Sequence, residues 1–207
     1  MKKETEYETG LPPELKVQES AEEYVAAQRF TYEDYCSWDG GDRWELIDGW
    51  AHKMEAPNRE HQTISMELSR QMANFLVNKT CDVYAAPFDV RLNVGEGKDT
   101  ILQPDLVVFC DQRKLDYKGA KGAPDFLIEI LSPSTRKKDE GSKLQKYEQY
   151  GVREVWLIDP LYRTVTTYVL NQVGMYEART YNHGGNQSVT SVVLADFTVN
   201  LETIFSE

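Results

Sequence analysis

The clearest periodic pattern in the chain is helical and follows Pro57. Within REHQTISMELSRQMANFLVN the large apolar residues recur three or four positions apart, at Ile64, Leu68, Met72, Phe75 and Leu76. This spacing places them along one face and predicts an amphipathic α-helix. Asn58 stands just before this stretch and is a residue type that commonly caps helices, so we expect the helix to begin there.

Two further helices are expected on other signals. Thr31 opens TYEDYCSW and can cap a short helix, which the DGGD turn would end. A longer helix is expected from about Lys137 to Tyr150, because Gly151 follows in the position where glycine commonly ends a helix.

Strand patterns occupy much of the remaining chain. RWELIDGWAHKM predicts two short strands joined by the Asp48-Gly49 turn, and TVTTYVLNQVGMYEART predicts a second hairpin around NQVG. Alternation in DVYAAPFDVRLNV indicates a strand interrupted near Pro87, and TILQPDLVVFC, DFLIEILS and EVWLIDP are strand-like runs rich in branched apolar residues. The stretch from Asp111 to Gly122 is interpreted as a charged connection.

The order of elements is helix, strand, strand, strand, helix, strand. Since a strand-helix-strand connection returns the last strand parallel to an earlier one, we expect an α/β fold with a mixed central sheet, flanking helices and added hairpins. Residues 29–207 are long enough for one domain with one substantial core. Residues 1–28, rich in Glu and Lys, are predicted to form a poorly ordered or peripheral arm.

Composition narrows the possibilities only slightly. A net charge of −11 disfavours a protein that coats DNA by general attraction to phosphates, although a local basic patch could still bind a backbone. No secretory signal and no apolar run of membrane-spanning length is present, which predicts a cytoplasmic protein without membrane contact. Cys36, Cys81 and Cys110 show no pairing or zinc-ligand spacing, so we expect a reducing compartment and no disulfide framework.

An acid in the middle of DFLIEIL is the first candidate for chemistry. Residues two apart in a strand share a face, so one face carries Asp125, Leu127, Glu129 and Leu131 and the other carries Phe126, Ile128 and Ile130. An ionised Glu129 among apolar neighbours is costly unless it meets a cation, a metal or hydrogen-bond donors. A position at the exposed end of the strand, or a simple ion pair with a lysine of the next helix, would also account for it.

Asp105, in QPDLVVF, is the second candidate acid. If its strand lies beside DFLIEIL, about 4.8 Å away, Asp105 and Glu129 can point at one place and hold Mg²⁺ or Mn²⁺, which prefer oxygen ligands. Asp125 is a poorer partner for Glu129, because four residues along a strand separate them by roughly 13 Å.

A lysine on the following helix is the third candidate. Lys143, Tyr147 and Tyr150 fall at i, i+4 and i+7, which puts Lys143 at the border of the buried face, where its ammonium could reach the carboxylates. A surface position is the alternative for this lysine, as for most lysines. Other lysines of the segment are expected to be solvated or in contact with phosphate: Lys137, Lys138 and Lys146.

Two strand acids followed by a helical lysine resemble the PD-(D/E)XK nuclease superfamily, whose core has the same order of elements. More narrowly, four segments are similar to the Uma-type "putative restriction endonuclease" family: WELIDG, the histidine of REHQ, QPDLVVF and APDFLIEILSPSTRKKDEGSKLQKYEQYGVREVWLIDP. The resemblance spans about Tyr32 to Asp159, and its long final motif is specific. It implies a restriction-endonuclease-like fold.

The resemblance also implies roles for individual residues. Asp105 and Glu129 would bind the metal, together with the Ile130 carbonyl. Lys143 would replace the lysine that most of the superfamily carries two residues after the second acid, a position that Leu131 holds here.

Earlier polar positions of the family are matched by His61 and Glu45. His61 could face the site or bond to backbone at the helix start, and Glu45 could face the site or solvent. Asp139 is expected to cap its helix or to pair with Lys143 at i+4.

The function expected on these grounds is that of a Mg²⁺- or Mn²⁺-dependent endonuclease that hydrolyses phosphodiester bonds, most directly in DNA, as a homodimer. Two alternatives remain open: a nuclease-fold protein that no longer cuts and serves as a binding or assembly module, and an acidic core around a structural cation.

Overall fold

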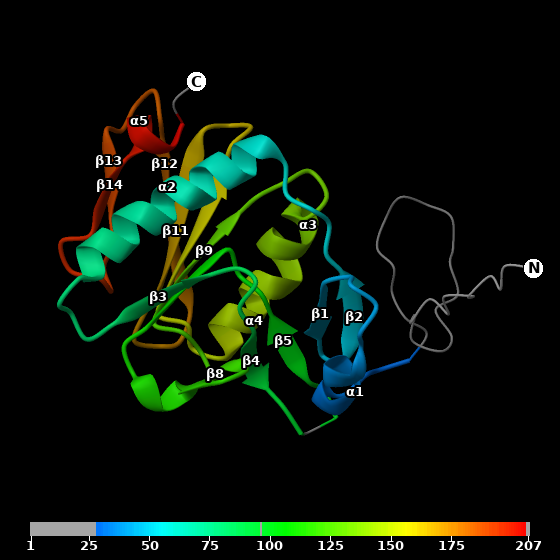
Figure 1. Cartoon of the computed structure of the whole chain (residues 1–207). Helices are drawn as coiled ribbons and strands as arrows, with labels where there is room; N and C mark the ends of the chain where they lie inside the picture. The colour runs from blue at the N-terminus through cyan, green and yellow to red at the C-terminus, as the bar shows by residue number, and fades with distance from the viewer. Residues whose placement is uncertain (1–27, 96, 206–207) are drawn as a thin grey trace, which may run out of the picture.

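The computed structural model describes residues 28–95 and 97–205 (Figure 1). The arm predicted for residues 1–28 therefore lies outside the described residues, apart from residue 28. From residue 28 onward the chain forms an α/β fold, as predicted, with helices packed on mixed sheets.

A six-stranded sheet lies at the centre of the molecule. Its strands, in spatial order, are β12 (Tyr176–Asn182), β11 (Thr164–Leu170), β10 (Glu154–Asp159), β9 (Phe126–Ile130), β6 (Leu106–Phe109) and β3 (Asp82–Ala85). β9 and β10 pair in parallel, as expected for strands joined through a helix, and the other pairs are antiparallel. The hairpin predicted around NQVG is formed by β11 and β12.

A second six-stranded sheet carries the other predicted hairpin. Its order is β2 (Trp50–Lys53), β1 (Trp44–Ile47), β5 (Thr100–Leu102), β4 (Val90–Asn93), β8 (Gly119–Lys121) and β7 (Leu115–Asp116). β7, β8 and a short 3₁₀ helix, η1 (Gln112–Lys114), lie in the segment interpreted as a connection and were not predicted. Nor was the C-terminal pair β13 (Ser188–Thr190) and β14 (Thr198–Asn200).

Two strand predictions need correction. DVYAAPFDVRLNV predicted one interrupted strand, but β3 belongs to the central sheet and β4 to the second sheet. TILQPDLVVFC was read as a single run, but its two halves belong to different sheets, β5 to the second sheet and β6 to the central sheet. Proline has no N–H to donate to a ladder, so Pro104 interrupts the run. Gln103, Pro104 and Asp105 thereby cross from one sheet to the other.

The predicted helices are present with the expected caps. The Thr31 side chain caps α1 (Tyr32–Ser37), and the Asn58 side chain caps α2 (Arg59–Leu76). The third comprises α3 (Arg136–Lys138), a π-helical segment η2 (Asp139–Lys143) and α4 (Leu144–Gln149), and a short α5 (Leu201–Ile204) ends the described chain. No helix in the described ranges is long and apolar enough to cross a membrane.

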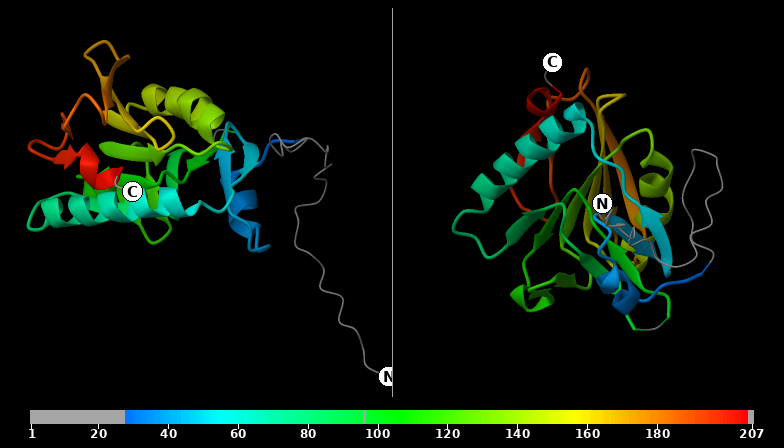
Figure 2. Two further views of the ribbon diagram at one scale, coloured as in Figure 1. Left: turned by 90° about the horizontal axis from the view of Figure 1, so that it is seen from above. Right: turned by 45° about the vertical axis from the view of Figure 1, so that its right-hand side comes forward.

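The two faces of the central sheet pack against different layers. The face with Phe126, Ile128 and Ile130 joins one apolar core with Ile64 and Leu68 of α2. The opposite face places Leu127 in a second core with Tyr147 of α4 and residues of the second sheet. Seen from above, the sheet lies between α2 and the α3–α4 helix (Figure 2, left). The predicted alternation along β9 is confirmed, and Glu129 faces the α3–α4 helix.

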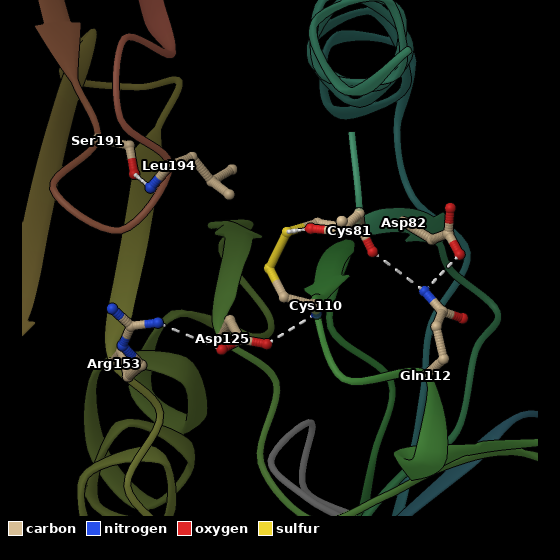
Figure 3. Close-up of a disulfide and its surroundings, with 9 residues drawn as sticks. Cys81, Asp82, Cys110, Gln112, Asp125, Arg153, Ser191 and Leu194 are labelled. Atoms are coloured by element: carbon tan, nitrogen blue, oxygen red, sulfur yellow. Dashed lines mark hydrogen bonds and ion pairs between the residues drawn. A yellow bond between two sulfur atoms is a disulfide. The ribbon is translucent and has the colours of Figure 1, made fainter. Parts of the chain in front are cut away.

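The expectation that the chain has no disulfide is wrong. Cys81 and Cys110 form one, between residues adjacent to the paired positions Asp82 and Phe109 of β3 and β6 (Figure 3). The two cysteines are 29 positions apart in sequence, and their pairing depends on the register of β3 and β6, which the cysteine spacing does not reveal. Cys36 is a free, exposed thiol.

Candidate functional site

Asp105 and Glu129 lie side by side, as the sequence predicted. The antiparallel register pairs Leu106 of β6 with Ile128 of β9, so the preceding Asp105 lies next to Glu129 on the same face. The backbone N–H of Ile130 donates to Asp105 Oδ2 over 2.7 Å and fixes this carboxylate against β9. The crossing of the chain between the two sheets therefore places one acid beside the other.

Lys143 contacts Glu129 from the helix that covers this face of the sheet. Its Nζ lies 2.6 Å from Glu129 Oε1, 3.0 Å from Glu45 Oε1 and 3.3 Å from Asp139 Oδ1. The residue is 2% exposed, so it is no surface lysine. The surrounding carboxylates raise its pKa well above the usual value, although burial acts to lower it. The predicted i+4 pair of Asp139 with Lys143 is present.

Glu45 faces the site rather than solvent. It is fully buried on β1, and its Oε1 accepts the backbone N–H of Gln103 at 2.9 Å. Lys138 Nζ lies 2.9 Å from its other oxygen, Oε2. Burial raises the pKa of Glu45, but the ammonium groups of Lys143 and Lys138 outweigh burial and hold the pKa far below its usual value. Glu45 is therefore an ionised carboxylate that joins the second sheet to the helix.

The His61 ring faces the site, which is the first of the two alternatives left open for it. Its backbone N–H donates to the Asn58 side chain at the start of α2, while its ring Nε2 lies 3.2 Å from Asp105 Oδ2. Burial lowers the pKa of His61, but its hydrogen bond to Asp105 and the charge of that carboxylate leave it raised overall. The ring nitrogen Nδ1 is buried without a hydrogen-bond partner among the described residues.

Several contacts in the site were not predicted. The Tyr147 hydroxyl, one turn beyond Lys143, donates to Glu129 Oε1. Lys138, expected to be solvated or at phosphate, is 9% exposed and forms an ion pair with Glu45. Lys146 is also paired, with Asp48 at 2.8 Å, whereas Lys137 is exposed as expected. The helical spacing of Tyr147 from Lys143 was a usable signal. Helical periodicity gave no signal for Lys138, because an ideal α-helix would turn it away from Lys143. The π segment Asp139–Lys143 turns Lys138 toward the site.

The site holds more acid than base. Four carboxylates, Glu45, Asp105, Glu129 and Asp139, surround two lysines, Lys138 and Lys143. Burial raises the pKa of Glu129 to about 8, and the neighbouring carboxylates add to this effect against the opposing charge of Lys143. Lys143 is shared among three carboxylates, so Glu129 has no full counter-charge of its own.

The donors that remain suit a divalent metal. The contacts of Glu129 are to Oε1 and those of the Asp105 side chain to Oδ2, so within the described residues Glu129 Oε2 and Asp105 Oδ1 have no hydrogen-bond or ion-pair partner. No preformed cluster of three or more His, Cys, Asp or Glu ligands occurs in the described ranges. Mg²⁺ is commonly held by one or two carboxylates together with waters and substrate phosphates, and this donor set fits that mode.

A cavity of about 210 Å³ adjoins these side chains. Its lining includes His61, Asp105, Glu129, Lys138 and Lys143. Asp125 lies elsewhere: its carboxylate accepts the backbone N–H of Cys110 and lies near Arg153 (Figure 3). The second PD pair of the sequence is therefore not part of the site, as predicted.

Comparison with known proteins agrees with this arrangement. Residues 31–202, most of the chain, match the Uma2 family, described as "Putative restriction endonuclease". The chain belongs to the Uma2 family. Uma2 membership supports a nuclease function in general, and it confirms the family resemblance that the sequence motifs indicated.

Two relatives extend the comparison. A putative nuclease belonging to DUF820 from Anabaena variabilis has a crystal structure that superposes with a TM-score of 0.70 at 19% identity, covering 86% of this Uma2 chain and 98% of the other chain. At that identity the match shows a shared fold. The uncharacterized protein slr1290 of Synechocystis is 27% identical over 128 residues, 61% of this chain and 66% of that protein's length.

Proposed function

We propose that the chain is a divalent-metal-dependent endonuclease that hydrolyses phosphodiester bonds in DNA. The observation that carries the proposal is the convergence of Asp105 and Glu129 on one face of the central sheet, with Lys143 Nζ 2.6 Å from Glu129. Restriction-endonuclease-like families generally use divalent metals, and the donor set here fits Mg²⁺ or Mn²⁺.

Asp105 and Glu129, with the Ile130 carbonyl, would hold the ion. When bound, such an ion lowers the pKa of a water molecule and stabilises the charge that develops on the phosphate. The Ile130 N–H bond keeps Asp105 oriented, and the Tyr147 hydroxyl and Lys143 keep Glu129 oriented.

Lys143 would supply the positive charge of the reaction. Its raised pKa keeps it protonated at neutral pH, so its charge can offset the charge that develops on the phosphate. It can orient the attacking water only if that water replaces one of its three carboxylate contacts. It does not act as a base in that state. His61 Nε2, 3.2 Å from Asp105 Oδ2, helps to hold that carboxylate in place.

Two identical sites are needed to cut both strands of a duplex, and a two-fold dimer is the simplest way to provide them. We therefore include a homodimer in the proposal. The alternative is a protein with the same fold that binds or assembles but does not hydrolyse DNA. It predicts no metal-dependent cleavage, and therefore no loss of cleavage when Asp105 is changed.

Cleavage of supercoiled plasmid and of single-stranded DNA, with Mg²⁺ or Mn²⁺, tests the proposal. Asp105→Asn and Glu129→Gln should each lower the rate by at least about 100-fold, the scale of losing one electrostatic stabiliser. Asp125→Asn is the matched control, because it changes the acid of the other PD pair outside the site, and it should cut like wild type. Wild-type protein no more active than Asp105→Asn would contradict the proposal.

A further inference from the structure

A second lysine of the same helix is directed into the site. Lys138 Nζ lies 2.9 Å from Glu45 Oε2, while Lys143 Nζ lies 3.0 Å from Glu45 Oε1. Two ammonium groups thus hold the two oxygens of one buried carboxylate. Both lysines also line the cavity beside Asp105 and Glu129.

An uninterrupted α-helix would not bring these lysines together. Residues five apart in an α-helix point about 140° away from each other, since each residue turns the helix by about 100°. The segment Asp139–Lys143 is π-helical, and i→i+5 bonding brings residues five apart closer to the same face than an α-helix does. Single π turns within α-helices are frequent at functional sites. The π segment is therefore what turns Lys138 toward the site.

The two lysines differ in the donors that remain to them. An ammonium group has three N–H donors, and Lys143 faces three carboxylates, those of Glu129, Glu45 and Asp139. Lys138 has one side-chain partner, Glu45, within the described part of the chain. Lys143 can bind a further acceptor only by giving one up, whereas Lys138 can bind an acceptor in the cavity and keep Glu45.

We propose that Lys138 binds a non-bridging phosphate oxygen of a nucleic-acid strand in the cavity, with Glu45 as the positioning residue that holds its ammonium group. This inference rests on the proposed function, because it takes a phosphodiester as the substrate. The two lysines then have different roles: Lys143 stays paired with the carboxylates of the site, and Lys138 binds the nucleic-acid strand.

Binding of a short fluorescein-labelled DNA duplex in EDTA, followed by fluorescence anisotropy over a series of salt concentrations, tests this role without turnover. Lys138→Gln should raise the Kd about ten-fold, as expected for a lost hydrogen bond to a charged group. It should also lower the slope of log Kd against log salt by about 0.9, because one phosphate contact is lost.

Lys137→Gln is the matched control, since it removes the same charge from the exposed neighbouring residue. It should bind within about two-fold of wild type. Lys138→Arg keeps the charge and should recover most of the affinity, which a purely structural role of Lys138 does not require. Thermal melting of each variant in the same buffer checks that it is folded.

The outcomes separate this inference from the proposed function. Wild type that cuts DNA, with Lys138→Gln no weaker in binding than Lys137→Gln, overturns the role of Lys138 alone. Wild type that never cuts, with the ten-fold loss in Lys138→Gln, keeps the role of Lys138 and rejects hydrolysis. A wild type that does not bind the duplex in EDTA overturns the role of Lys138, and the cleavage assay with metal then decides on hydrolysis separately.

Discussion

Glu129 is a buried acid that shares the ammonium group of Lys143 with two other carboxylates. Burial raises its pKa to about 8, whereas Glu45, which two lysines contact, keeps its pKa far below the usual value. The same residue type thus has opposite protonation behaviour at two neighbouring positions, because the cations are distributed unequally. Without metal, Glu129 holds a proton over much of the neutral range, and a divalent ion would take the place of that proton.

This difference predicts how stability depends on pH. In EDTA, folded protein keeps a proton on Glu129 that the unfolded chain, with a pKa near 4.5, has already released. The folded state therefore binds more protons between about pH 5 and pH 8, so wild type should lose stability as the pH rises through this window. Glu129→Gln cannot ionise and should lose less, by several degrees of Tm, since 1 kcal/mol corresponds to about 2–4 °C at this size.

Scanning calorimetry of both proteins in EDTA measures the effect. His61 also has a raised pKa and contributes a loss of the same sign, but it is present in both proteins and cancels in the comparison. Parallel Tm curves for wild type and Glu129→Gln would contradict the assigned protonation of Glu129.

At the scale of elements, sequence patterns predict the local features of the strands and helices but not how β5 and β6 pair in the sheets. The alternation along β9, the caps at Thr31 and Asn58 and both hairpins could be predicted, because they depend on local spacing. The break at Pro104 that sends β5 and β6 into different sheets depends on tertiary pairing. The π turn before Lys143 has no signature in the helical periodicity.

The cross-strand disulfide gives a prediction at this scale. The chain has three cysteines, and the structure joins Cys81 to Cys110, so Cys36 should be the only thiol to react. Protein purified without reductant and then denatured should show one thiol per chain with a thiol-specific chromogenic reagent, and three after reduction. Cys36→Ser should show none before reduction. Three thiols in unreduced wild type would mean that β3 and β6 are not cross-linked.

At the scale of the whole molecule, the site is assembled from parts that are distant in sequence. Glu45 comes from the second sheet, His61 from α2, Asp105 and Glu129 from the central sheet and Lys143 from the helix that covers it. The identities of these residues could be predicted from motifs. The convergence of Asp105 and Glu129 could be predicted as well. Whether Glu45 and His61 join them could not, because that depends on how the two sheets and α2 meet.

The net charge of −11 is also a property of the whole molecule. The molecule as a whole repels a polyanion, so binding of DNA would have to rely on local cations such as Lys138 and on a metal ion. This is why the metal is central to the account.

Titration calorimetry of Mn²⁺ into metal-free protein tests that central claim most directly. Wild type and the control Asp125→Asn should bind Mn²⁺ at a site in each chain, and Asp105→Asn should bind it at least ten-fold more weakly, the least expected for loss of a ligand. The absence of binding by wild type, or undiminished binding by Asp105→Asn, would contradict the assignment of Asp105 and Glu129 as a metal site.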